Sequence, residues 1–261
     1  EVLSPGWRAV LDAGWGDATR ARYDYTWSHH PDGSPAVTYR YDRIHARRGY
    51  RWRHPCHETL YPDRIDEQYV ELAIELHHWP DPTKPRSQYL PLLAVATEEQ
   101  PHDSRMAHYY GRELMFRGHD EQAIAELRRH LELPASTWAP ERAASQRFIG
   151  RCLTRLGRRA EALEAFRAAT VTSPDTREPW VELAQACHDA QLWQECYDAA
   201  VAGLAIDERP AIYINDPLAW SERLDDLASV AAWRTGRHEQ ALAHGLRAAA
   251  LAPDDERIAA N

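Results

Sequence analysis

The stretch that decides the fold is GRRAEALEAFRAATVTSPDTREPWVELAQACHDAQLWQEC, residues 157–196. Ala, Leu, Glu and Arg dominate it, and its apolar residues recur at helical spacing with few β-branched runs, so it predicts helices. GRRAEA starts at 157 and the similar QLWQEC starts at 191, so the period is 34 residues, and Pro174 predicts the end of a helix between the two starts. The stretch therefore predicts one complete helix–turn–helix repeat.

Two further repeat starts flank this stretch, GHDEQA at 118–123 and GRHEQA at 236–241. Seven residues before each of the four starts lies a small residue, where two helices must approach closely: Gly111, Gly150, Ala184 and Ser229. The pattern resembles the tetratricopeptide repeat, a helix–turn–helix unit of about 34 residues. The resemblance implies an α-solenoid over residues 104–261.

The inserts between repeats are also distinctive. The first and last spacings exceed the middle one, and the extra residues fall in ELPASTWAP (132–140) and RPAIYINDP (209–217), which are rich in proline and aromatic residues. Loops of this kind extend from a solenoid and often carry function. We therefore expect these two inserts to be candidate functional segments.

The first hundred residues have a different pattern. ARYDYTWSHH (21–30) and PAVTYRYDRIHA (35–46) carry β-type residues at alternate positions and are separated by the turn signal PDGS, so they predict a hairpin. GYRW (49–52) predicts another strand, and residues 63–79 predict a helix leading into a strand. The proline-rich WPDPTKPRS (79–87) predicts a connection. We therefore expect a first domain over residues 1–80, a linker over 81–103 and a helical repeat domain over 104–261.

Charge and cysteine usage exclude several classes of protein. The net charge is -9 and the pI about 5.9, so the chain as a whole has no electrostatic footprint for nucleic acid. Its four cysteines form no CxxC pair, which argues against a structural zinc site or a disulfide scaffold and favours the reducing cytoplasm. The longest apolar stretch, LPLLAVA (90–96), is too short to cross a bilayer. These features predict a cytoplasmic protein with no transmembrane segment and no nucleic-acid partner.

The decapeptide GYRWRHPCHE, residues 49–58, combines two arginines, two histidines, a cysteine, two aromatic residues and a glutamate. Further arginines precede it at 40, 43, 47 and 48. Such a cluster is either a solvated basic face or a site for an anionic ligand. Both interpretations stay open on the residues alone.

The decapeptide, followed by LHHWPDPTKPRSQYLPLL (76–93), HYYGRELMFRG (108–118) and YINDPLAW (213–220), resembles family 2 glycosyltransferases that carry repeats at their carboxyl end. This resemblance implies a mainly α chain, in which a partial α/β, GT-A-like catalytic segment over residues 1–80 precedes the tetratricopeptide-like α-solenoid. It also implies a metal-dependent inverting glycosyltransferase that uses Mn or Mg, a nucleotide-sugar donor and a peptide, protein or glycan acceptor. The repeats would bind the acceptor or a partner.

The resemblance also assigns roles to individual residues. Glu58 is the expected catalytic base, and His57 and Glu1 are the expected metal ligands, with a structural histidine as the alternative for His57. The expected donor contacts are Arg47, Arg51, Trp52, His78, Lys84 and Arg86. Because the chain starts at Glu1, the family's metal-binding aspartates and nucleotide-binding strands are not in it, and another polypeptide would have to supply that donor-binding half.

A non-enzymatic interpretation competes with this one. A tetratricopeptide solenoid can act as a scaffold whose groove binds an extended peptide or a helix. A zinc hydrolase is disfavoured because the sequence has no HExxH motif. Binding of a nucleoside diphosphate in the presence of Mn or Mg would distinguish the enzyme from the scaffold.

Overall fold

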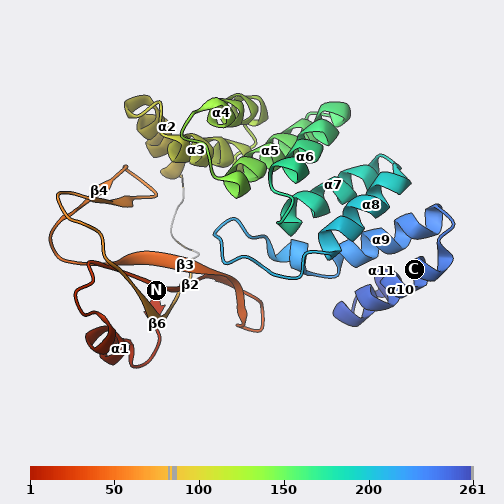
Figure 1. Cartoon of the computed structure of the whole chain (residues 1–261). Coiled ribbons are helices and arrows are strands. Elements are labelled where there is room, and N and C mark those ends of the chain that lie inside the picture. The colour runs from red at the N-terminus through yellow and green to blue at the C-terminus, as the bar shows by residue number, and fades with distance from the viewer. Residues whose placement is uncertain (82, 84–86, 260–261) are drawn as a thin grey trace. The chain divides into compact units, whose positions relative to one another are not determined.

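The computed structural model describes residues 1–81, 83 and 87–259 (Figure 1). The chain divides into two compact units. The first contains Glu1–Leu92 together with Ala211–Asn215, and the second contains Leu93–Pro210 and the described residues from Asp216 onward. Each unit has its own secondary-structure class, the first mainly strands and the second helices.

The first unit is built on a four-stranded sheet with the order β1-β6-β2-β3. The sheet strands are β1 (Val2–Leu3), β2 (Arg20–His29), β3 (Pro35–His45) and β6 (Tyr69–His77). β2 pairs antiparallel with β3 and parallel with β6, and β1 pairs antiparallel with β6. A separate hairpin consists of β4 (Tyr50–Arg53) and β5 (Thr59–Pro62). The hairpin expected over residues 21–46 is confirmed, whereas the helix expected after residue 63 is wrong, because β6 begins at Tyr69 without one.

One face of the sheet forms the core of this unit. Ala21, Tyr23 and Tyr25 alternate along β2 and are buried against Leu72 and Ile74 of β6. Helix α1 (Trp7–Gly14) packs its apolar side chains on this cluster. The period-two alternation seen in the sequence is therefore the pattern of a half-buried strand.

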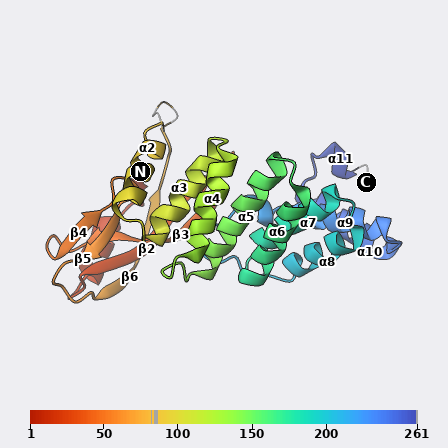
Figure 2. The same ribbon diagram turned by 90° about the horizontal axis from the view of Figure 1, so that it is seen from above.

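The second unit is a stack of antiparallel helix pairs (Figure 2). Its helices are α3 (Ser104–Phe116), α4 (Asp120–Glu132), α5 (Ala139–Arg155), α6 (Arg159–Thr172), α7 (Arg177–Asp189), α8 (Trp193–Leu204), η1 (Pro217–Trp220), α9 (Arg223–Arg234), α10 (His238–Leu251) and α11 (Glu256–Ala259). Successive pairs α3–α4, α5–α6, α7–α8 and α9–α10 correspond to the four repeats. Each pair buries its apolar face on its neighbours, which is how a solenoid gains stability.

Each repeat start is a tight turn between the two helices of a pair. Gly118, Gly157 and Gly236 have φ of 76°, 75° and 78°, in the left-handed region that glycine adopts readily. Gln191 occupies the same position in the third repeat with φ of 58°. The recurrent glycine is therefore a backbone requirement, and the third repeat meets it with a less suitable residue.

The small residues before the turns allow close helix packing, as expected. A Cβ atom added to Gly111 would lie 2.6 Å from Leu127, and one added to Gly150 would lie 2.6 Å from the Phe166 ring. In the fourth repeat the hydroxyl of Ser229 donates to the carbonyl of Ala241 at 2.9 Å. These positions hold the two helices of each pair together.

Gly150→Ala is expected to destabilise the solenoid by about 1–3 kcal/mol, because the added methyl group overpacks a filled core against Phe166. Chemical denaturation followed by far-ultraviolet circular dichroism measures the change. An unchanged midpoint for Gly150→Ala would show that the α5–α6 contact accommodates an added methyl group.

The linker expected over residues 81–103 needs a correction. Helix α2 (Tyr89–Glu99) lies inside it, with Leu93 and Ala96 fully buried. The apolar run LPLLAVA is therefore a packed helix, and the boundary between the two compact units falls within it, between Leu92 and Leu93. No helix in the described ranges is both long and apolar enough to cross a bilayer.

Candidate functional site

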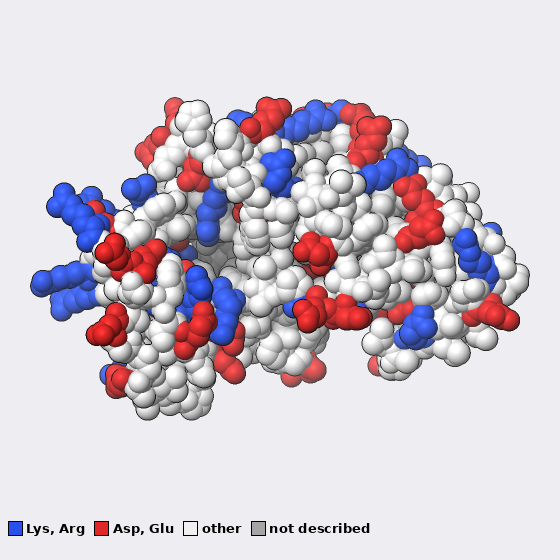
Figure 3. All heavy atoms as spheres, viewed as in Figure 1, with Lys and Arg blue, Asp and Glu red and all other residues white. Residues whose placement is uncertain are grey.

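The decapeptide GYRWRHPCHE forms β4 and the turn that leads to β5. His54 and His57 in this turn have φ of 75° and 51°, which residues other than glycine adopt infrequently. Cys56 between them is buried. Arginine side chains project from the surface over the hairpin in Figure 3. The decapeptide is thus an exposed basic strand that ends in a constrained turn.

Three predicted site residues of this hairpin have partners close by. The Nε of Arg51 donates to the carboxylate of Asp63 at 2.6 Å. The guanidinium carbon of Arg43 lies 5.1 Å from the centre of the Trp52 ring. Arg43 also donates to the backbone carbonyl of Glu58 at 2.8 Å, and its Nη1 is 4.0 Å from the Glu58 carboxylate. Trp52 and Glu58 are therefore grouped around Arg43, to which the resemblance assigned no role.

His57 lies apart from that group. Its imidazole stacks on the ring of Tyr89, with 5.6 Å between centroids and 24° between planes. Stacking and a constrained backbone together fix the orientation of the ring. This setting is compatible with a structural histidine, and the predicted role as metal ligand stays a prediction.

Glu1 and His78 are brought together by the pairing of β1 with β6. The Oε1 of Glu1 accepts a hydrogen bond from the Tyr25 hydroxyl at 3.3 Å and lies 3.9 Å from Nδ1 of His78. The Trp27 ring stacks on His78, with 4.7 Å between centroids and 4° between planes. One predicted metal ligand and one predicted donor contact therefore share a site with two aromatic rings.

A second histidine cluster was missed by the sequence analysis. The Nε2 of His29 and the Nδ1 of His77 are 3.0 Å apart, and the Trp79 ring stacks on His29 at 3.8 Å. Burial, and after it the neighbouring His77, lower the pKa of His29. The signal was present as SHH at the end of β2 and HHW at the end of β6. It became meaningful only once those two strands were known to be parallel neighbours.

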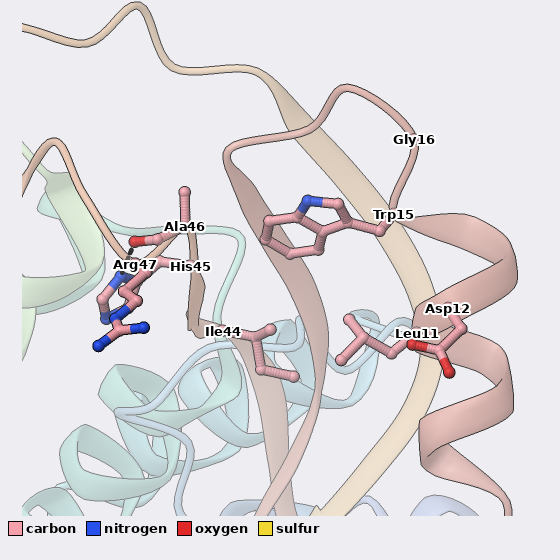
Figure 4. Close-up of a pocket in the computed structure, with 8 residues that line it drawn as sticks. All are labelled: Leu11, Asp12, Trp15, Gly16, Ile44, His45, Ala46 and Arg47. Atoms are coloured by element: carbon pink, nitrogen blue, oxygen red, sulfur yellow. Dashed lines mark hydrogen bonds between the residues drawn. The ribbon is translucent and has the colours of Figure 1, made fainter.

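Arg47 lines a pocket of about 640 Å³ elsewhere in the first unit (Figure 4). The other lining residues are Leu11, Asp12, Trp15, Gly16, Ile44, His45 and Ala46. Figure 4 shows the apolar side chains of Leu11 and Ile44 pointing toward each other beside the Trp15 ring, with Arg47 on the far side. The pocket lining includes none of the other predicted site residues, although the ring of its His45 lies 5.8 Å from that of Trp52.

The predicted site residues do not converge on one metal centre. Lys84 and Arg86 lie outside the described residues. Within residues 1–81, 83 and 87–259, no group of three or more His, Cys, Asp and Glu side chains is placed to hold a metal ion. Glu1 and His78 supply two candidate ligands, fewer than Mn or Mg requires. The residues described here therefore do not fit a complete divalent-metal site.

The second unit carries a concentration of arginine and aromatic side chains on α3. Arg105, Tyr109, Arg112 and Phe116 follow at intervals of four, three and four, so they share one face of the helix. The guanidinium carbons of Arg105 and Arg112 lie 5.2 and 4.6 Å from the centre of the Tyr109 ring. Phe116 is 62% exposed. We call these four residues the α3 stripe.

A buried ionic network joins α5 to α7. Arg147 and Arg151 both donate to the carboxylate of Glu182, at 2.6 Å and 2.8–2.9 Å. Asp216 lies 3.9 Å from Arg147 and 3.5 Å from Arg151. The two cations are therefore matched by two carboxylates, and this part of the solenoid carries no excess charge.

The insert before α9 is attached to α7. The backbone N–H of Asp216 donates to Glu178 at 3.0 Å, and the indole N–H of Trp220 donates to the same carboxylate at 3.3 Å. Glu178 lies in the first turn of α7 and is buried. The chain's own insert therefore covers part of the first helix of the third repeat.

The cysteines of the solenoid are packing residues. Burial raises the pKa of the Cys152, Cys187 and Cys196 thiols to about 12. A thiol with such a pKa is protonated at neutral pH and is a poor nucleophile.

No protein-family model and no curated protein matches the sequence. Solved structures do match the fold. The crystal structure of MamA has 12% identity and a TM-score of 0.51, over 64% of this chain and 89% of that one. PilF from Pseudomonas aeruginosa has 15% identity and a TM-score of 0.52, over 64% of this chain and 69% of that one.

A further MamA structure, from Desulfovibrio magneticus, has 15% identity and a TM-score of 0.50, over 64% of this chain and 86% of that one. At such low identities the likeness concerns the fold alone. It identifies a tetratricopeptide-like helical-repeat solenoid in a mainly helical chain. None of these structures indicates a glycosyltransferase domain, so the expected GT-A-like segment has no support from the comparisons.

Proposed function

We propose that the chain is a tetratricopeptide-like scaffold that binds a peptide or protein segment on the first helices of its first two repeats, α3 and α5. The observation that carries this proposal is the α3 stripe, where an aromatic ring flanked by two arginines is followed by the exposed Phe116. Exposed aromatic and arginine side chains are the types that dominate binding energy at protein interfaces. Solenoids offer such helix faces to extended peptides or helices.

The insert helps to locate the binding surface. It occupies part of α7 through Glu178, so the equivalent face of the third repeat is partly covered by the chain itself. On α5, Phe148 lies beside the stripe, with its ring centre 6.5 Å from that of Phe116. Phe148 is only 8% exposed, so it supports the Phe116 ring from beneath, and the surface available to a partner is centred on the stripe at the side that contacts α5.

A peptide screen with the full chain tests the proposal. Short peptides of varied composition would be titrated by fluorescence polarisation, and Phe116→Ser is expected to weaken binding of the selected peptides by about tenfold, or about 1.4 kcal/mol. The matched control is Val171→Ser, which truncates an even more exposed apolar side chain on α6, the second helix of its repeat. Absence of any binding peptide, or equal weakening by both variants, would contradict the proposal.

Glycosyl transfer is the second candidate function, and the proximity of Glu1 and His78 favours it. The two side chains could contribute to a donor site in which further ligands complete the metal coordination. Calorimetric titration of nucleoside diphosphates and their sugars, each with Mn or Mg, is the test. Nucleotide binding that depends on the metal and is lost in Glu1→Gln would support an enzyme. If neither the nucleoside diphosphates nor their sugars bind, the result would argue for the scaffold alone.

A further inference from the structure

We propose that the segment bound on α3 and α5 is acidic and that Arg112 binds one of its carboxylates. This inference rests on the proposed function and specifies the chemistry of the partner. It follows from the charge, orientation and spacing of the α3 stripe.

The orientation of Arg112 is fixed before any ligand binds. Tyr109 is buried, and the guanidinium carbon of Arg112 lies 4.6 Å from the centre of its ring. A cation held over an aromatic face loses less side-chain freedom on binding than a solvated one does. Arg112 is therefore a preorganised cation on the surface that the proposed function uses.

The charge of Arg112 is not neutralised inside the solenoid. Other arginines nearby have carboxylate partners, such as Arg117 with Glu113 at 2.8 Å and Arg151 with Glu182 at 2.8 Å. Among the described residues, no carboxylate lies within ion-pair distance of Arg112, and its buried Nε has no hydrogen-bond acceptor. A carboxylate from a partner would supply the missing charge by accepting hydrogen bonds from the outer guanidinium nitrogens of Arg112, since its Nε is buried.

An acidic protein segment fits better than a polyanion. The chain carries a net charge of -9, which repels long polyanions such as nucleic acid. A short segment has to satisfy only the local charge around the stripe.

The spacing of the stripe predicts a sequence pattern in the partner. Arg112 and Phe116 are four residues apart, which is about 6 Å along a helix. Residues i and i+2 of an extended chain are about 6.6 Å apart. An extended partner would therefore place an acidic residue against Arg112 and an apolar residue two positions away against the exposed Phe116.

Fluorescein-labelled synthetic peptides test this inference on the full chain. One peptide repeats Glu-Ser-Leu, a second repeats Gln-Ser-Leu, and a third has the composition of the first in scrambled order. The Glu-Ser-Leu peptide is expected to bind about tenfold more tightly than the Gln-Ser-Leu peptide, and the difference should shrink at high salt. Arg112→Glu is expected to abolish the difference.

Arg128→Glu is the matched control, because it makes the same charge change at an exposed position on α4. It should leave the preference for glutamate within about twofold of the parent, since a surface charge outside the binding face has only a screened effect. Arg112→Lys provides a second variant that keeps the charge and loses the bidentate fork, and it is expected to retain part of the preference. Helical content by circular dichroism verifies that each variant is folded.

Two negative outcomes separate this inference from the proposed function. Equal binding of the Glu and Gln peptides, or equal losses in Arg112→Glu and Arg128→Glu, would overturn the acidic specificity while leaving a peptide-binding scaffold in place. If no peptide binds here or in the wider screen, the scaffold function itself fails.

Discussion

Glu182→Ala is expected to destabilise the second unit by about 3–5 kcal/mol, because it leaves a buried guanidinium without its main partner. Arg147 is only 4% exposed, and both Arg147 and Arg151 donate to the Glu182 carboxylate. Burial alone would raise the pKa of Glu182, but the two guanidiniums outweigh it and hold that pKa below its usual value. In the variant, the one carboxylate that Arg147 would retain among the described residues is that of Asp216, 3.9 Å away.

Glu195→Ala is the control for this prediction. Glu195 also accepts two hydrogen bonds from an arginine, Arg167, but the two side chains are 35% and 44% exposed. Its loss should therefore cost about 0–1 kcal/mol. Urea denaturation of both variants gives the two free energies of unfolding, and similar values would show that the α5–α7 network is no more desolvated than a surface pair.

A double variant distinguishes the net contribution of the Arg147–Glu182 ion pair to stability from the cost of leaving Arg147 unpaired. Replacing Arg147 with Met and Glu182 with Leu removes both charges from the site. Buried ion pairs replaced by apolar residues of similar volume are often neutral in stability or better. The double variant is therefore expected to be more stable than Glu182→Ala alone, and a further loss would indicate that Arg151 and Asp216 depend on both removed side chains.

The solenoid could be predicted from the sequence because its requirements are local. A left-handed turn favours glycine at 118, 157 and 236, and close helix packing favours a small residue seven positions earlier. These constraints recur at fixed offsets, so a single sequence shows them. The α5–α7 network follows no such offset, because Arg147 and Glu182 are paired by the stacking of two repeats.

The candidate site in the first unit was less predictable for the same reason. Glu1 and His78 meet only because β1 pairs with β6, and His29 meets His77 only because β2 runs parallel to β6. Conversely, the crowding of residues 49–58 in the sequence did not produce one site. The positive φ of His54 and His57 turns the chain, so that His57 stacks on Tyr89 while Trp52 and Glu58 contact Arg43.

A buried histidine network makes the acid stability of the solenoid a sharp test of its packing. His108 on α3 and His130 on α4 are fully buried and share the hydroxyl of Ser145 on α5, at 2.8 and 2.9 Å. Burial lowers the pKa of His108 to about 3, although the nearby Glu141 raises it in part. Arg112, His130 and Arg105 also face His108 and lower its pKa further.

This shift predicts a loss of stability at mildly acidic pH. In the unfolded chain His108 takes up a proton near pH 6.5, whereas in the folded chain it stays neutral until about pH 3. The folded state therefore has its full stability above pH 6.5 and loses it progressively as the pH falls toward 3, by about 2 kcal/mol between pH 7 and pH 5.

His108→Gln, which can keep a hydrogen bond to Ser145, is expected to remove that part of the loss in urea titrations at the two pH values. His119→Gln changes an exposed histidine and should leave the pH dependence as it is. The same pH dependence in His108→Gln and the parent protein would mean that His108 is protonated inside the folded repeat, with an acceptor for its second nitrogen.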